Sequence, residues 1–172
     1  KYSLENELLV PGLQYSSNVG SSGFAVMPFN FVDDEIPMNR KQFIEELSLE
    51  GQRVLTRVDF NVPLNDDLNI TDNGRIKAAL PTVNYIIQNE GKAVLMSHLG
   101  RPGGERVESM TLKPAAVELS RLLGQPVTLA PDCIGEEVKN LVNGMQNGDV
   151  VLLENLRFHK AETKNDPLFC EA

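Results

Sequence analysis

From residue 53 onward, the chain alternates between short apolar runs and longer segments in which apolar residues are regularly spaced. Short apolar runs with the length and composition of buried strands lie at 53–58, 93–96, 126–129 and 149–153. Between these runs, apolar residues recur at intervals of three and four, which is typical of a helix with one buried face. Four strands alternating with helices through short links predict an α/β fold. We expect a three-layer, Rossmann-like parallel sheet with helices on both faces.

The apolar positions of the three predicted helices lie within 76–87, 112–123 and 134–142. Pro81 falls inside the first of these helices, so we expect a kink there or two short helical pieces. Gly91 follows that helix and is expected to be its C-cap, because glycine tolerates the left-handed backbone that ends many helices.

The two ends of the chain do not show this alternation. Residues 1–37 have no clear helix or strand period and are interpreted as an unassigned leader or linker, with Met38 as a possible natural start. Near the other end, Asp166 is expected to cap a short helix that begins at Pro167. We therefore expect one truncated domain over residues 38–172, in a chain that is a fragment.

The chain carries 24 acidic and 16 basic residues, a net charge of −8. This charge argues against a partner that is a nucleic acid or an acidic membrane, and no stretch approaches the roughly 18 apolar residues of a membrane span. Residues 1–37 contain no Arg, which favours a cytoplasmic protein over one with a transit peptide. Cys133 and Cys170 are expected to be reduced thiols, and no metal site is expected because the chain has only two histidines.

Polar side chains directly follow three of the predicted strands. They are Asp59 and Asn61 after the first strand, His98 and Arg101 after the second, and Glu154, Asn155 and Arg157 after the fourth. The carboxyl ends of parallel strands share one edge, and ligands bind in the crevice there. We therefore expect these groups to lie together and to bind a small anion with several charges.

Each of these groups also has a structural alternative. Asp59 and Asn61 suit turns, the glycine-rich segment after His98 suits a surface loop, and His159 is expected at the surface. Arg75 begins a predicted helix, where its charge opposes the helix dipole, so helix stability does not explain it. The sequence contains neither a P-loop nor a G-x-G-x-x-G segment after a strand.

Four segments, in order, resemble the motifs of the phosphoglycerate kinase family. They are residues 53–64, 75–82, 97–102 and 152–158. The resemblance implies an incomplete amino-terminal domain of a two-domain kinase. Such an enzyme transfers a phosphoryl group between 1,3-bisphosphoglycerate and ADP, giving 3-phosphoglycerate and ATP in glycolysis.

The resemblance also implies a role for each residue of the site. The substrate-binding residues would be Asp59, Phe60, Asn61, Arg75, His98, Leu99, Gly100, Arg101 and Arg157, and Arg75 would also be catalytic. Mg²⁺ with ADP or ATP would bind to a carboxy-terminal domain absent from this chain, so the fragment would hold no metal and be inactive alone. The whole enzyme would be a cytoplasmic monomer. The alternative is a non-catalytic α/β module that binds a small anion or a partner protein.

Overall fold

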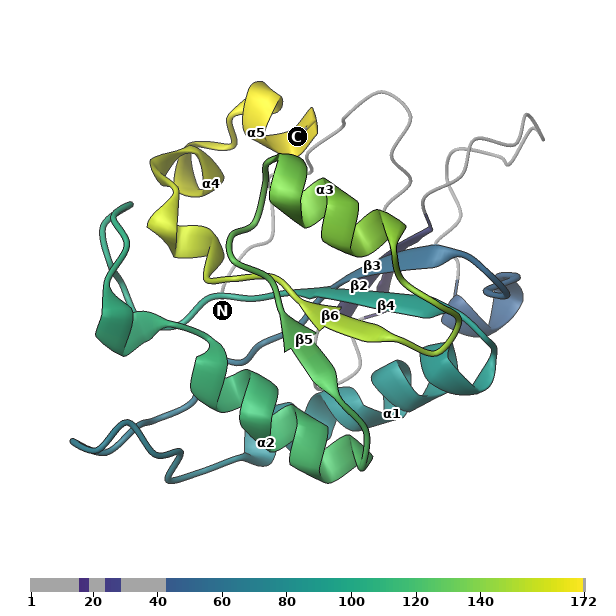
Figure 1. The fold of residues 1–172 in the computed structure, drawn as a ribbon, viewed down its shortest axis with the longest axis horizontal. Coiled ribbons are helices and arrows are strands. Elements are labelled where there is room, and N and C mark those ends of the chain that lie inside the picture. Colours follow the sequence, from purple (N-terminus) through teal and green to yellow (C-terminus); the bar gives the residue numbers. More distant parts are fainter. Residues whose placement is uncertain (1–15, 19–23, 29–42, 172) are drawn as a thin grey trace.

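The computed structural model describes the backbone of residues 16–18 and 24–28, and residues 43–171 with their side chains. Within these residues, six strands form one sheet in the order β1-β2-β3-β4-β6-β5 (Figure 1). The strands are β1 (Ser16–Asn18), β2 (Phe24–Pro28), β3 (Arg53–Arg57), β4 (Lys92–Met96), β5 (Val127–Leu129) and β6 (Val150–Leu152). The four strands from β3 to β5 in this order are parallel, as the sequence predicted.

Helices separate the parallel strands along the chain. They are α1 (Gly74–Gln88), α2 (Lys113–Leu123) and α3 (Glu136–Asn143), followed after β6 by α4 (Lys160–Lys164) and α5 (Pro167–Glu171). Three short 3₁₀ turns are η1 (Ile44–Glu46), η2 (Glu108–Met110) and η3 (Leu156–Phe158). None of the helices in the described part of the chain has the length and apolar character needed to cross a membrane.

Alternate residues of the parallel strands face opposite sides of the sheet. Leu95 and Leu152 belong to a core shared with α1 and α2, whereas Val94 and Val151 belong to a smaller core with Val138 of α3. In Figure 1, α1 and α2 lie together on one side of the sheet and α3 on the other. The predicted three-layer α/β architecture is confirmed.

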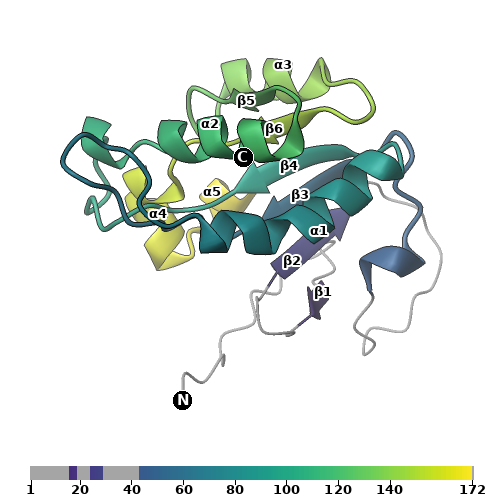
Figure 2. The same cartoon turned by 90° about the horizontal axis from the view of Figure 1, so that it is seen from below.

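Two segments of the supposed leader contribute strands, which the sequence did not predict. β2 pairs antiparallel with the outer edge of β3, and β1 pairs with β2. Figure 2 shows both strands extending the sheet beyond β3, on the side away from β5. An edge strand presents unpaired N–H and C=O groups. A second segment can therefore pair with it through its backbone alone, even when its own sequence has no hydrophobic period. The other residues of 1–37, and the expected start at Met38, lie outside the described residues.

α1 is one continuous helix, so the expected division into two pieces at Pro81 does not occur. Pro81 removes the N–H that would bond to the carbonyl of Lys77. Both residues are exposed, so that carbonyl lies on the solvent side, where water can satisfy it. The opposite side of the helix is anchored by buried residues that include Ile76 and Val83.

The end of α1 also differs from the prediction. The C-cap is Asn89, and Glu90, with φ of 58°, takes the left-handed conformation expected of Gly91. The N–H of Gly91 then donates to the carbonyl of Ile86 at 2.9 Å. Glycine is required at 91 for lack of space: a Cβ there would lie 2.8 Å from Cγ2 of Ile86 and 3.3 Å from the carbonyl of Leu49.

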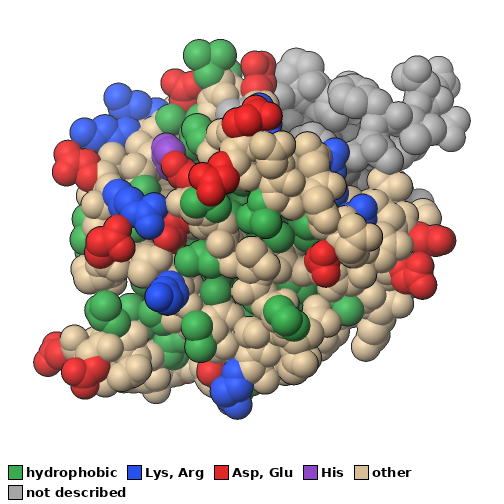
Figure 3. Space-filling model, in the orientation of Figure 1, with side chains coloured by type: hydrophobic (Ala, Val, Ile, Leu, Met, Phe, Trp, Pro, Cys, Tyr) green, Lys and Arg blue, Asp and Glu red, His purple; other side chains and the backbone are tan. Residues whose placement is uncertain are grey.

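The predicted cap of α5 is confirmed. The carboxylate of Asp166 accepts the N–H of Leu168 at 2.9 Å at the start of this helix. The space-filling view shows hydrophobic side chains across the middle of one face, between α2 and α3 (Figure 3). There β5 is the outer strand, with no partner on its free edge among the described residues.

Candidate anion site at the carboxyl edge of the sheet

The polar groups after β3, β4 and β6 meet at the carboxyl edge of the sheet. The side-chain oxygen of Asn61 accepts the N–H of Gly100 at 2.9 Å. The Arg157 guanidinium donates to the carbonyl of Gly100 at 3.0 Å. The backbone of Gly100 is therefore held by groups from both neighbouring strand ends, which brings three predicted site residues together.

Two features make glycine necessary at position 100. Its φ of 63° lies in the left-handed region, which is strained for other residues. A Cβ at this position would also lie 2.9 Å from the sulfur of Met110. The loop therefore passes close to η2 at this point, and a side chain at 100 would displace it.

Arg75 and Asp59 form an ion pair at the mouth of this edge, and about half of each side chain is exposed. The other carboxylate oxygen of Asp59 accepts the N–H of Asn61 at 3.1 Å, as in the turn that the sequence suggested. An exposed ion pair contributes only about 0–1 kcal/mol. A ligand with several negative charges can therefore compete with Asp59 for Arg75.

His98 is half-buried beside two arginines. Burial lowers the pKa of His98 below its usual 6.5, and the positive charges of Arg157 and Arg57 lower it further. The imidazole is consequently neutral at pH 7 without a ligand. An anion bound nearby would offset these charges and favour the protonated, donating form.

Phe60 and Leu99 lie in the core and not at the surface of the site. The two residues are 0% and 6% exposed, so their side chains pack in the core. The N–H of Phe60 donates to the hydroxyl of Ser97 at 2.9 Å, and the carbonyl of Leu99 accepts from the amide of Asn155 at 2.7 Å. These residues anchor the strand ends, and their expected role in binding the substrate stays a prediction.

The two arginines of the site differ in availability. Arg101 is exposed and makes no polar contact with another described residue. Arg157 is partly buried. Its Nε has no hydrogen-bond partner among the described residues, and one of its terminal nitrogens donates to the carbonyl of Gly100. Arg101 is thus available to a ligand, whereas Arg157 is largely committed to holding the loop.

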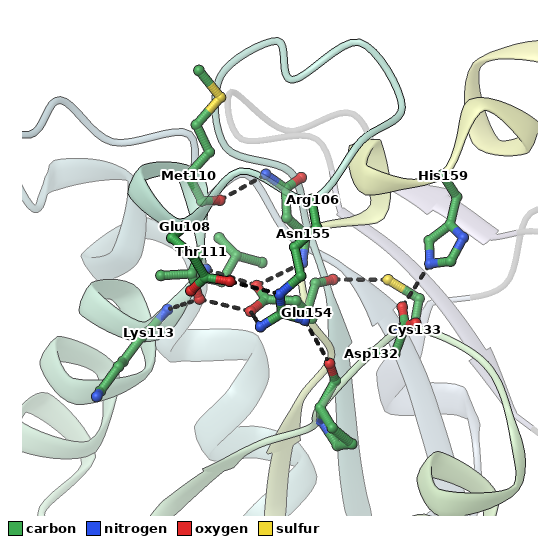
Figure 4. A network of polar contacts seen from close by, with 12 residues as sticks. Arg106, Glu108, Met110, Thr111, Lys113, Asp132, Cys133, Glu154, Asn155 and His159 are labelled. Atoms are coloured by element: carbon green, nitrogen blue, oxygen red, sulfur yellow. Dashed lines mark hydrogen bonds and ion pairs between the residues drawn. The ribbon is translucent and has the colours of Figure 1, made fainter.

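Glu154 belongs to the protein framework, although it also follows a strand. Its carboxylate, 1% exposed, accepts the N–H groups of Leu112 and Asn155, both at 2.8 Å, and the hydroxyl of Thr111 at 2.6 Å (Figure 4). The guanidinium of Arg106 lies 3.7 Å away. This buried carboxylate fixes the start of α2 to the end of β6, so it does not face a ligand.

Asn155 is a second framework residue, although the sequence analysis grouped it with the anion-binding side chains. Its fully buried amide donates to the carbonyls of Leu99 and Met110 at 2.7 and 2.8 Å, and accepts the N–H of Arg157 at 3.1 Å. Three segments that are distant in sequence are joined by this one side chain. These hydrogen-bond partners come together only in the folded chain, so the sequence could not indicate this role.

The end of β5 reaches the same edge of the sheet, and the residues that follow it were not among the site residues expected from the sequence. There a carboxylate oxygen of Asp132 and Nε2 of His159 form a hydrogen bond of 2.6 Å. The Cys133 thiol donates to the carbonyl of Glu154 at 2.9 Å. Burial raises the pKa of Cys133. The His159 side chain is 25% exposed, so it reaches the surface in part while the rest of the ring is enclosed. The rule that located the other strand ends applies equally to Asp132 and Cys133.

Comparison with known proteins identifies relatives for most of the chain. A sequence model of the phosphoglycerate kinase family matches residues 44–172. Phosphoglycerate kinases of Chloroherpeton thalassium and Aquifex aeolicus are each 54% identical, over 133 and 132 residues respectively. In both cases the match covers 77% of this chain and 33% of the relative, so the chain spans about a third of the length of these relatives.

Solved structures give the same result for the fold. The crystal structure of phosphoglycerate kinase from Pyrococcus horikoshii matches 69% of this chain and 29% of that protein, with 36% identity and a TM-score of 0.63. The enzyme from Coxiella burnetii matches 68% and 28%, with 34% identity and a TM-score of 0.58. The sequence match, the fold and the grouping of strand ends agree, and the chain belongs to the phosphoglycerate kinase family.

Proposed function

We propose that this chain carries the glycerate-binding part of a phosphoglycerate kinase, which transfers a phosphoryl group between 1,3-bisphosphoglycerate and ADP. The observation that carries the proposal is the Gly100 backbone, held by Asn61 and Arg157 at an edge where Arg75 and Arg101 are exposed. The chain as a whole has a net charge of −8, so exposed arginines grouped at one edge are a local feature and not the result of a general excess of basic residues.

The proposed substrate, 3-phosphoglycerate, has a phosphate, a hydroxyl and a carboxylate. Arg101 suits the phosphate because a guanidinium donates in a plane to two oxygens and stays charged. Asp59 and Asn61 suit the hydroxyl and the carboxylate end, since they offer both acceptors and an amide donor. His98 would join them once bound anion charge favours its protonation.

Arg75 is the proposed catalytic residue. Phosphoryl transfer depends on positioning and on stabilising charge that spreads over the phosphoryl oxygens. Arg75 is half exposed and held only by the weak pair with Asp59, so it can turn toward a phosphoryl group without losing a buried contact. Its charge at the helix start, unfavourable for the helix, is favourable for this task.

The strand ends after β3, β4 and β6 do not fit Mg²⁺. The exposed carboxylate among them, Asp59, is paired with Arg75, and the surrounding guanidiniums repel a dication. Glu154 is committed to Thr111 and to backbone N–H groups. We assign Mg²⁺ and the nucleotide to another part of the whole enzyme, which we expect to be a cytoplasmic monomer, and we expect this chain alone to form no ATP.

Calorimetric titration of the 172-residue chain with 3-phosphoglycerate tests the binding role. We expect saturable binding that Arg101→Ala weakens by about tenfold or more. Arg121→Ala is the matched control: it removes the same exposed charge from the last turn of α2 and should leave the affinity unchanged. Equal effects of the two substitutions, or no binding at all, would contradict the proposal.

The alternative, a non-catalytic module for small anions, predicts a different selectivity. Inorganic phosphate lacks the carboxylate and hydroxyl that Asp59 and Asn61 are proposed to contact. If inorganic phosphate and 3-phosphoglycerate bind equally well, the site recognises only an anion, and the glycerate assignment fails.

A further inference from the structure

Three side chains with different donor atoms converge beside the end of β5. A carboxylate oxygen of Asp132, the sulfur of Cys133 and an imidazole nitrogen of His159 all lie within 4.8 Å of one another. Figure 4 shows Asp132 and Cys133 on the loop after β5, with the His159 ring directed at them from the end of η3. The cluster therefore joins the ends of β5 and β6, which are separated in sequence by α3 and by β6 itself.

We propose that Asp132, Cys133 and His159 form a binding site for Zn²⁺. Thiolate, imidazole and carboxylate are the ligands that zinc takes in proteins, at about 2.0–2.3 Å. Tetrahedral geometry at these lengths sets the ligand atoms about 3.4 Å apart. The present separations, from 2.6 Å between Asp132 and His159 to at most 4.8 Å, bracket that value. Side-chain adjustments of about 1 Å suffice.

A fourth position is available without a further side chain. The carbonyl oxygen of Glu154 already lies 2.9 Å from the Cys133 sulfur, and Asp132 is 46% exposed, which gives an ion and a water molecule access from solvent. A water or this carbonyl can complete four-coordination.

The local charge favours a cation. The carboxylates of Asp132, Glu154 and Glu162 all act electrostatically on the thiol. Arg106 lies 3.7 Å from Glu154, and Arg57 pairs with Glu162 at 3.1 Å. Asp132 forms no ion pair with Lys or Arg among residues 43–171, where its ion-pair partner is the imidazole, and Arg106 acts on it only through longer-range electrostatics. A dication would supply the missing positive charge.

Binding needs no oxidant or reductant. The Cys133 thiol releases its proton to solvent as sulfur bonds to zinc, and the His159 imidazole carries its proton on the other ring nitrogen when Nε2 gives its lone pair to the metal. Asp132 exchanges its hydrogen bond to the imidazole for a bond to the metal. Because the His159 ring also packs on Phe169 at 5.2 Å between centroids, the ion would link the β5 loop to η3 and α5.

Cobalt, a spectroscopic substitute for zinc, tests the site in the reduced, metal-free 172-residue chain. We expect one Co²⁺ per chain, a thiolate-to-cobalt charge-transfer band, and displacement of Co²⁺ by Zn²⁺. Cys133→Ser should abolish the band, whereas Cys170→Ser, the matched change at the exposed cysteine, should retain it. Asp132→Asn and His159→Gln should each weaken binding by about tenfold or more.

Absence of the band in the unaltered chain, its persistence in Cys133→Ser, or its loss in Cys170→Ser would overturn the proposal. Circular dichroism of each metal-free variant reports whether it is folded. If Cys133→Ser unfolds, the partly exposed positions decide: unchanged affinity in both Asp132→Asn and His159→Gln rejects the site. None of these outcomes depends on binding of 3-phosphoglycerate.

Discussion

At the scale of single residues, position in the folded chain decides what each polar group can do. Arg101 and Arg157 are the same residue type at two strand ends, yet one is exposed and the other holds the backbone of Gly100. Glu154 and Asp59 are both carboxylates after strands, but only Asp59 reaches solvent. Residue type predicted what kind of ligand the site would bind. Burial distinguishes the side chains that can reach a ligand from those that hold the surrounding backbone in place.

His98 gives the protein a pH-dependent stability. Its pKa is lower in the folded chain than the usual 6.5, so the unfolded chain binds more protons as pH falls through this range. His98 therefore reduces the free energy of unfolding as pH drops below about 6.5, until the folded state is protonated too. Urea unfolding at about pH 7.5 and about pH 5.5 measures this loss, which should be smaller in His98→Gln. Identical losses in both proteins would exclude His98 as the source.

Arg75 is expected to affect turnover more than affinity. A contact made mainly in the transition state lowers kcat when it is removed and leaves KM nearly unchanged. In a whole enzyme containing this segment, Arg75→Ala should reduce kcat by about 100-fold or more, measured by steady-state kinetics. Arg121→Ala serves as the control. A rise in KM alone would make Arg75 a binding residue.

At the scale of elements, the start of α2 depends on a strand to which it is not adjacent in sequence. Its first turn contains no acidic residue of its own to balance the helix dipole. The Glu154 carboxylate from the end of β6 supplies that negative charge and accepts the N–H of Leu112. The helix was predictable from its apolar spacing, but this cap was not, because it comes from outside the local sequence.

Glu154→Ala should therefore be severely destabilising. It leaves buried donors at Thr111, Leu112 and Asn155 without their acceptor, which costs about 3–5 kcal/mol. Thr111→Val removes only one of the three bonds and should cost about 1 kcal/mol. Urea unfolding of both variants measures the free energies. Similar small losses would mean that water replaces the carboxylate.

At the scale of the whole molecule, the sheet has two different edges. Its β3 side is extended by β2 and β1, whereas β5 is open among the described residues. The match covers only 33% of the length of the relatives, so the site described corresponds to only part of those proteins. The assignment of residues 38–172 as a separate domain stays a prediction.

A chain that begins at Met38 tests the contribution of the first two strands. It loses the partner of β3, and an unpaired strand edge is a template for pairing with other chains. We expect a lower thermal midpoint than in the 172-residue chain and concentration-dependent self-association in sedimentation. A monomeric truncated chain with an unchanged midpoint would show that residues 1–37 contribute nothing to the sheet.

The sequence alone determined the elements and the edge where the site lies. Short apolar runs predicted the parallel strands, and apolar spacing of three and four predicted the helices, because both patterns follow from the local geometry of the backbone. Local signals failed at Gly91, which is confined by Ile86 and also by the distant Leu49, and in β2, which pairs through its backbone.

Only the tertiary structure decided which side chains meet. β6 is the last of the six strands in sequence but lies between β4 and β5 in the sheet. Its end therefore touches both neighbours, placing Arg157 against Gly100 on one side and His159 against Asp132 on the other. No periodicity records that strand order, because it results from packing the whole chain and not from the spacing of residues within an element.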